Sequence, residues 1–128
     1  RLMLVQEGEG WRWLEDSARH PFSFLIGGQG WAFELTAEEA HGLGRALVQL
    51  VQEHHDLASQ LMPEESISIE LERGPVWIAL EGDRNAWSLR FVLTPGAECR
   101  AVEGSWLPGP SAALVAALAL WASPHGCS

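Results

Sequence analysis

The chain has 128 residues, of which 47% are hydrophobic and 20% charged, a composition typical of a globular domain with a sizeable core. Its formal net charge is −9, from 17 acidic and 8 basic residues, and every basic residue is arginine. Because nucleic-acid affinity depends mainly on Lys and Arg side chains that neutralise phosphates, this balance disfavours a protein dedicated to binding a phosphate backbone. We expect one domain over residues 1–128, with residues 1–6 and 123–128 loosely ordered.

The two cysteines, Cys99 and Cys127, lie far apart in the sequence. This spacing argues against a disulfide framework and favours a reducing, cytoplasmic compartment. The apolar part of the N-terminal segment is too short for a signal peptide, and charged residues follow it too early. The longest apolar run, residues 112–122, has 11 residues, whereas a helix that spans a bilayer needs about 20. We therefore expect no membrane anchor.

The first third of the chain predicts three short strands, at residues 11–14, 22–26 and 31–35. In each of them aromatic residues recur two positions apart, which places them on one face of a strand. The segment Gly27-Gly28-Gln29-Gly30 is expected to form a hairpin, since glycine supplies the positive φ that tight turns need. A phosphate-binding loop would instead lead from a strand into the N-terminus of a helix.

A long helix follows, from Ala37 to Met62. Thr36-Ala37-Glu38-Glu39 is a capping box that starts it, and Pro63 ends it. Leucines recur along it at spacings of three and four, and we call them the leucine stripe: Leu43, Leu47, Leu50, Leu57 and Leu61. At 1.5 Å per residue the helix is about 39 Å long, roughly the diameter of the whole domain. It is expected to pack beneath two sheet halves or against a partner subunit.

The second half of the chain repeats the order of strands followed by a helix. Residues 67–72, 76–81 and 87–93 alternate apolar and polar side chains between turn signals, which predicts an antiparallel meander. A short edge strand at residues 99–103 is a possible addition. The last helix starts near Pro110 and is apolar all round, typical of a helix buried on most faces. The predicted fold is thus α+β, βββ-α-βββ(β)-α, with two antiparallel strand-rich halves each followed by a helix.

The sequence contains no pattern that indicates catalysis, a metal or a cofactor. His54 and His55 are neighbours on a helix, so their side chains point about 100° apart and do not readily share a metal ion. Cys99 lies between Glu98 and Glu103, whose charges disfavour a thiolate. The serines lack the Gly-x-Ser-x-Gly elbow of hydrolases. We expect a protein that is not an enzyme and that has no cofactor.

Seven tryptophans are an unusual number for this length. Most fall on the apparent inner faces of strands, but Trp77 alternates out of phase with its apolar neighbours and is expected on the outer face of its sheet, near Arg90. An outward tryptophan in a half-apolar patch favours a protein interface. The alternatives are partial burial of Trp77 in the core and a platform for single-stranded bases, which stack on indoles with about 1–3 kcal/mol per base.

Glycine–tryptophan turns recur along the chain. They are Glu7-Gly8-Glu9-Gly10-Trp11-Arg12, the segment from Gly27 to Thr36, Trp87-Ser88-Leu89-Arg90 and Glu103-Gly104-Ser105-Trp106. Together they resemble a small cyanobacterial family known only as domain of unknown function 1818, over nearly the whole chain. The fold of that family is similar to that of single-stranded-DNA-binding transcriptional regulators such as the plant Whirly proteins. The resemblance implies two strand-rich halves, each followed by a helix, and dimers assembled through helices, but it assigns no catalytic or binding residue.

These observations together predict a cytoplasmic protein-interaction module that forms a homodimer. The expected interface consists of the leucine stripe, Trp77 and the last helix. The alternative is a single-stranded nucleic-acid binder that uses Trp77, Arg90 and Arg73 on an open sheet face.

Overall fold

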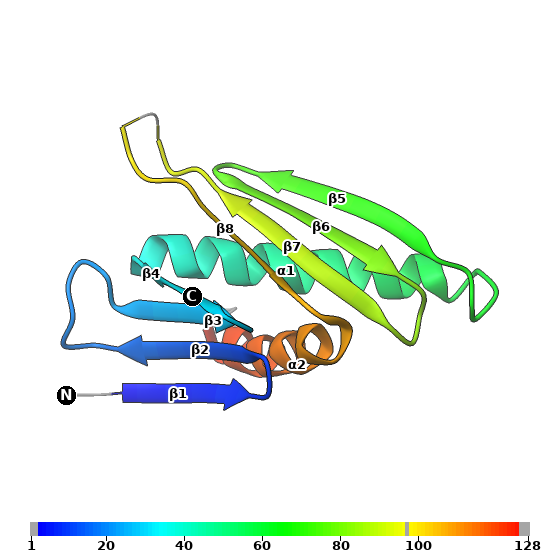
Figure 1. Cartoon of the computed structure of the whole chain (residues 1–128), viewed down its shortest axis with the longest axis horizontal. Helices are drawn as coiled ribbons and strands as arrows, with labels where there is room; N and C mark the ends of the chain where they lie inside the picture. The colour runs from blue at the N-terminus through cyan, green and yellow to red at the C-terminus, as the bar shows by residue number, and fades with distance from the viewer. Residues whose placement is uncertain (1–2, 97, 126–128) are drawn as a thin grey trace.

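The computed structural model describes residues 3–96 and 98–125, and its strands form two antiparallel sheets of four strands each (Figure 1). The first sheet contains β1 (Met3–Gly8), β2 (Trp11–Asp16), β3 (Phe24–Gly28) and β4 (Trp31–Leu35), and helix α1 (Ala37–Ala58) follows it. The second sheet contains β5 (Ile67–Arg73), β6 (Val76–Gly82), β7 (Trp87–Leu93) and β8 (Val102–Trp106), and helix α2 (Pro108–His125) follows it. The predicted α+β class, with two strand-rich halves each followed by a helix, is confirmed.

Each strand pairs with the next strand along the chain, so both sheets are simple meanders. Three of the connecting turns contain a glycine with positive φ, namely Gly10 at 80°, Gly30 at 84° and Gly74 at 58°. This left-handed region is open to glycine without the steric cost that a Cβ atom brings. The glycine-rich segment before Trp31 is therefore a hairpin, as predicted, and it joins β3 to β4.

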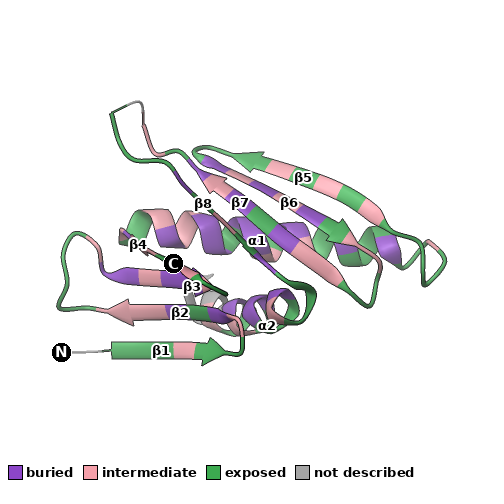
Figure 2. Cartoon of the chain, in the orientation of Figure 1, coloured by how far each residue is buried: buried purple, intermediate pink, exposed green. Residues whose placement is uncertain are grey.

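The two helices pack on the inner faces of the sheets. Helix α1 packs against β5 and β6, while α2 packs against α1, β7 and the first two strands. In Figure 1 the second sheet lies in front of α1 and its other face is not covered by a helix. Buried positions alternate with partly buried or exposed ones along β6 and β7 (Figure 2), as expected for strands with one face toward the core. One continuous core joins side chains of both sheets and both helices.

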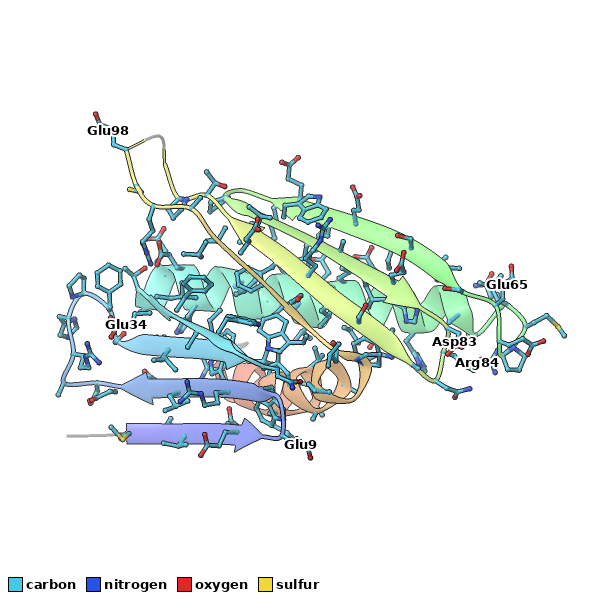
Figure 3. All side chains as sticks on the ribbon, in the orientation of Figure 1. Glu9, Glu34, Glu65, Asp83, Arg84 and Glu98 are labelled. Atoms are coloured by element: carbon cyan, nitrogen blue, oxygen red, sulfur yellow. The ribbon has the colours of Figure 1, made fainter. Side chains whose placement is uncertain are left out.

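Helix α1 begins at the predicted capping box but ends earlier than predicted. The backbone N–H of Glu39 donates to the Thr36 hydroxyl at 3.2 Å, and the N–H of Thr36 donates to the Glu39 carboxylate at 2.8 Å. The helix stops at Ala58 instead of Met62. Arg84, labelled in Figure 3 at the turn after β6, donates from Nη2 to the carbonyl oxygens of Ala58 (3.1 Å) and Leu61 (2.7 Å). It thereby supplies a donor to two carbonyls at and just beyond the end of the helix, where intrahelical partners run out.

The ends of the chain differ from the prediction. Met3–Gly8 forms β1, a strand that the sequence did not predict, because both of its faces are exposed and the alternation that would have revealed it is absent. Helix α2 extends to His125, beyond the apolar run that predicted it, and the loose order of residues 1–6 and 123–128 stays a prediction. Residues 1, 2 and 126–128 lie outside the described part of the chain. The edge strand of the second sheet is Val102–Trp106, displaced from the expected 99–103.

Helix α2 buries one face, not most of its surface as predicted. Leu114 and Leu118 are fully buried, whereas Leu120 is 75% exposed. The exposed face also carries small side chains: Ala112, Ala113, Ala116 and Ala119. A uniformly apolar helix therefore packs on the core with only one side, and its composition alone did not indicate which side is free.

Two tryptophans join the sheets along a seam between β3–β4 and β8. Trp31 of the first sheet donates from Nε1 to the carbonyl oxygen of Ser105 in the second sheet (3.1 Å). Trp106 of the second sheet donates from Nε1 to the carbonyl oxygen of Gly27 in the first sheet (2.9 Å). The two indole rings pack with centroids 5.3 Å apart. Each sheet thus supplies one indole donor to the backbone of the other.

Glycines beside these rings provide the room that the indoles occupy. A Cβ atom on Gly28 would lie 2.4 Å from Nε1 of Trp31, its cross-strand partner. A Cβ atom on Gly104 would lie 2.6 Å from Cη2 of the same ring. Gly8 has the same relation to Trp11. The glycine–tryptophan turns of the sequence are therefore packing devices, in which an indole lies across a glycine on the paired strand.

Candidate functional site

The leucine stripe faces the chain's own sheets. Leu43 and Leu47 are 0% exposed and Leu50 is 1% exposed, within the core formed with the second sheet. These three side chains have no surface left for a partner, which corrects their assignment to an interface. Leu57 is 47% exposed and Leu61 is half-buried, so only the C-terminal end of the stripe reaches the surface.

His54, which interrupts the stripe, is also in the interior. Its side chain is 2% exposed, and its Nε2 lies 3.2 Å from the carbonyl oxygen of Gly82 at the end of β6. The imidazole lies beside the indole of Trp87, with ring centroids 6.0 Å apart. Within the described residues no group of three His, Cys, Asp or Glu side chains is placed to hold a metal ion. His54 therefore fastens α1 to the second sheet.

The outer face of the second sheet is the first candidate for a binding surface. Directly opposed residues of neighbouring strands share a face, so the register defines two rows across the sheet. The first row is Glu72, Trp77, Val92 and Glu103, and the second is Glu70, Ala79, Arg90 and Ser105. Glu81 lies on the same face of β6, two residues beyond Ala79. We call this surface the acidic face, because it carries four glutamates and one arginine.

Trp77 and Arg90 contact each other at the centre of the acidic face. The guanidinium carbon of Arg90 lies 4.9 Å from the centroid of the Trp77 ring, a cation–π arrangement. Trp77 is half-buried, whereas Arg90 is exposed. A hollow of about 370 Å³ lies beside Arg90 and is lined in part by Glu70 and Glu81. The structure thus brings together Trp77 and Arg90, as the sequence predicted, among carboxylates.

Arg73 does not join this surface. It follows Leu71 by two residues, so it lies on the inner face of β5 with the apolar side chains of that strand. Its Nη1 donates to Oε1 of Gln49 on α1 at 3.1 Å. The predicted nucleic-acid face of Trp77, Arg90 and Arg73 is therefore corrected, since its third member points to the opposite side of the sheet.

Two carboxylates have a lowered pKa, and both have structural partners. Burial alone would raise the pKa of Glu39, but hydrogen bonds from Arg100 and Thr36 and the Arg100 charge outweigh it and lower the pKa. The Arg100 guanidinium contacts both oxygens of Glu39, at 2.9 and 3.3 Å. The pKa of Asp83 is lowered mainly by backbone N–H donation from Asn85 and Ala86. Asp83 orders the turn between β6 and β7, where Figure 3 labels it.

The fold defines the class of this protein as an α+β protein of two four-stranded meanders, each followed by a helix. Neither helix in the described residues is long and apolar enough to cross a membrane. The chain belongs to the family described as Domain of unknown function (DUF1818), whose family model matches residues 6–120. The family resemblance drawn from the glycine–tryptophan turns is thereby confirmed.

A solved structure from Prochlorococcus sp. NATL2A has the same fold. That protein, described as one of unknown function from the DUF155 family, is 39% identical to this chain. The match covers 91% of this chain and 95% of that chain, with a TM-score of 0.84. None of the curated proteins matches the chain. The likeness to Whirly proteins stays a prediction.

Proposed function

We propose that the protein is a non-catalytic, cytoplasmic binding module that takes an arginine- or lysine-rich segment of a partner protein on its acidic face. The observation that carries this proposal is the Trp77–Arg90 stack at 4.9 Å, surrounded by exposed glutamates. An aromatic ring with acidic neighbours is suited to guanidinium and ammonium groups, because the ring face and the carboxylates both attract cations.

Charge supports a basic partner over a nucleic acid. The acidic face has four carboxylates and the single guanidinium of Arg90, and the whole chain carries −9. A phosphate backbone approaching this face meets like charge, whereas a basic segment gains in association rate and in selectivity. The alternative of single-stranded nucleic-acid binding retains Trp77 and Arg90 but loses Arg73 to the other side of the sheet.

The internal stack supports a guanidinium group as the part of the partner that the ring takes. Arg90 is exposed and bonded to no carboxylate among the described residues, so it can leave the indole at small cost. A partner arginine then takes its place, for a cation–π energy of about 0.5–1 kcal/mol at an exposed site. The Glu72 carboxylate, opposite Trp77 on the neighbouring strand, is placed to pair with the incoming charge.

One substitution separates the two functions by the sign of its effect. Arg90→Gln removes a like charge and frees the indole for a basic peptide, so affinity for a labelled peptide of alternating Arg and Ser should rise about 2- to 5-fold. The same change should weaken binding of a labelled oligothymidine, because it removes a phosphate partner. Fluorescence anisotropy at low salt measures both. Arg12→Gln, which makes the same charge change on an exposed position of the first sheet, is the matched control.

A second pair of variants tests the carboxylates. Glu72→Gln should weaken peptide binding, whereas Glu64→Gln, in the exposed loop before β5, should leave it unchanged. Failure of the peptide to bind at low salt would overturn the proposal, as would equal effects of Glu72→Gln and Glu64→Gln. Tight oligothymidine binding that Arg90→Gln abolishes would favour the nucleic-acid function instead.

For the expected homodimer we propose β1 as the contact, in place of the buried leucine stripe. β1 is an edge strand, and Met3, Leu4 and Val5 are 43–49% exposed on its two faces. An edge strand with apolar side chains is a template for pairing with another strand, and two copies of β1 can pair antiparallel about a two-fold axis. Val5 continues an apolar row with Leu14 and Leu25 on the outer face of the first sheet.

Light scattering on a sizing column tests this contact. Val5→Asp should convert a dimer to a monomer with an unchanged circular dichroism spectrum. Leu120→Asp, at the other strongly exposed apolar position on α2, should leave the dimer intact. A monomeric parent protein would overturn the proposal, and a dimer that only Leu120→Asp dissociates would move the contact to α2.

A further inference from the structure

A cleft of about 440 Å³ lies between the first half of α1 and the turn that joins β5 to β6, on the other side of the second sheet from the acidic face. Its walls combine charged and apolar groups. The lining residues that matter here are Glu38, Arg45, Arg73, Pro75, Val76 and Leu93. The volume is within the range of about 300–1,000 Å³ that is usual for small-molecule sites.

Two guanidinium groups line this cleft from different elements. Arg45 follows Gly42 by three residues and precedes Gln49 by four, so all three share one face of α1. Arg73 ends β5 and donates from Nη1 to Oε1 of Gln49 at 3.1 Å. Gln49 therefore holds Arg73 toward the helix face that carries Arg45, and the neutral amide leaves the Arg73 charge unpaired.

Two of the other arginines that the structure describes pair with a carboxylate. Arg100 binds both oxygens of Glu39, and Arg19 forms an ion pair with Glu34. By contrast, Arg45 makes no hydrogen bond or ion pair with any residue that the structure describes, and Arg73 has only its neutral partner.

The charge of the cleft is opposite in sign to that of the chain. Glu39 also lines the cleft, but its ion pair with Arg100 compensates its negative charge. Glu38 is exposed in the first turn of α1, two helical turns from Arg45. Two unpaired guanidiniums against one unpaired carboxylate leave a local excess of positive charge, in a protein whose net charge is −9. A site of this kind attracts an anion locally, at short range.

The rest of the wall is apolar and rigid. Val76 and Leu93 belong to the buried core, with 2% and 0% exposure, and the Thr94 N–H fixes the turn by donating to the Pro75 carbonyl oxygen at 2.9 Å. We propose that the cleft binds a small organic anion, in which a carboxylate or phosphate group lies between Arg45 and Arg73 and an attached apolar group lies against Pro75 and Pro95, the prolines of the cleft wall that reach the surface. Guanidinium groups suit both oxyanions, because their planar forks match either one in bidentate geometry.

Amide chemical shifts of the ¹⁵N-labelled protein test the proposal directly. Benzoate and phenyl phosphate should each shift the amides of Gly42, Gly74 and Val76 and saturate. Acetate and inorganic phosphate, which lack the apolar group, should do so at least several-fold more weakly. The tighter of the two aromatic anions identifies the head group that the cleft prefers. Rising salt should weaken all four, since the attraction is ionic.

Variants assign the effect to the two arginines. Arg45→Gln and Arg73→Gln should each reduce affinity for the preferred anion about tenfold, whereas Arg12→Gln, the same charge change at an exposed position of the first sheet, should leave it unchanged. Absence of saturating shifts at roughly 20 mM ligand, well above a millimolar dissociation constant, would overturn the inference. Shifts that persist in Arg45→Gln and Arg73→Gln would overturn it as well. Peptide binding to the acidic face involves neither Arg45 nor Arg73, so either proposal can fail alone.

Discussion

Gly104→Ala tests whether the tryptophan seam holds the two sheets together. Gly104 lies on β8 opposite Phe91. An added Cβ atom would lie 2.6 and 2.7 Å from Cη2 and Cζ2 of Trp31, and 2.9 Å from Cε1 of Phe91. Carbon atoms pack best at about 3.5–4.0 Å, so two rings would each have to move by roughly 1 Å.

The rings have little freedom to move. Trp31 is tied to Ser105 by its hydrogen bond of 3.1 Å and packs on Trp106 at 5.3 Å. Overpacking of this kind costs about 2–3 kcal/mol, and the smaller entropy of the unfolded alanine chain offsets about 0.5–1 kcal/mol of it. The free energy of unfolding should fall by about 1–2.5 kcal/mol, which for a chain of this length lowers Tm by roughly 3–10 °C.

Gly42→Ala provides a matched control of opposite sign. Gly42 lies inside α1, and a Cβ atom there would have no neighbour nearer than Cγ2 of Val76 at 4.0 Å. The same change should therefore raise the free energy of unfolding by about 0.5–1 kcal/mol. Urea denaturation followed by circular dichroism measures both variants. A Gly104→Ala protein as stable as the parent would refute the packing argument. A destabilised Gly42→Ala protein would show that alanine lowers stability even where its Cβ atom meets no close neighbour, so the loss in Gly104→Ala could not be assigned to the clash with the rings.

Trp106→Phe should lower the free energy of unfolding by about 1–2 kcal/mol more than Trp13→Phe. Both variants lose indole volume, but only Trp106 gives up a buried hydrogen bond, at 2.9 Å to the Gly27 carbonyl oxygen. The Nε1 of Trp13 has no acceptor among the described residues. Urea midpoints of the two variants measure the difference, and equal losses would contradict it. The lowered pKa values of Glu39 and Asp83 imply stability that is present above their ordinary values of 4.5 and 3.8 and that disappears as pH falls through the still lower folded values. The free energy of unfolding should therefore fall less steeply with decreasing pH in Glu39→Gln and in Asp83→Asn than in the parent protein. Equal slopes in variant and parent would exclude those carboxylates as the cause.

The sequence predicted the fold wherever an element has one buried and one exposed face. The alternation along residues 76–81 and 87–93 and the capping box at Thr36 were sufficient to place β6, β7 and the start of α1. β1 was missed because both of its faces are exposed. Arg84, which donates to carbonyls at and beyond the end of α1, comes from a turn distant in sequence, so no local pattern contains this contact.

The candidate sites were predicted in part. The phase of Trp77 identified the outer face of the second sheet, and the same rule applied to Arg73, two residues after Leu71, would have placed it on the inner face. The spacing of the leucine stripe is the same whether it packs on its own sheets or on a partner, so periodicity alone cannot distinguish the two. The cleft lined by Arg45 and Arg73, which we call the arginine cleft, was not predicted, because it joins α1 to a turn that follows much later in the chain and no sequence spacing indicates that proximity.

The acidic face and the arginine cleft lie on opposite sides of one hairpin, and the structure predicts that they act independently. Arg73 and Trp77 flank the β5–β6 turn, which is held by the Thr94–Pro75 hydrogen bond of 2.9 Å and by the bond from Arg73 to Gln49 of 3.1 Å. A rigid turn that shares no side chain between the two surfaces transmits little energy. Peptide and anion titrations of the Arg45→Gln and Glu72→Gln variants, singly and combined, should therefore be additive within about 0.5 kcal/mol. A larger coupling would mean that the hairpin moves when either surface is occupied.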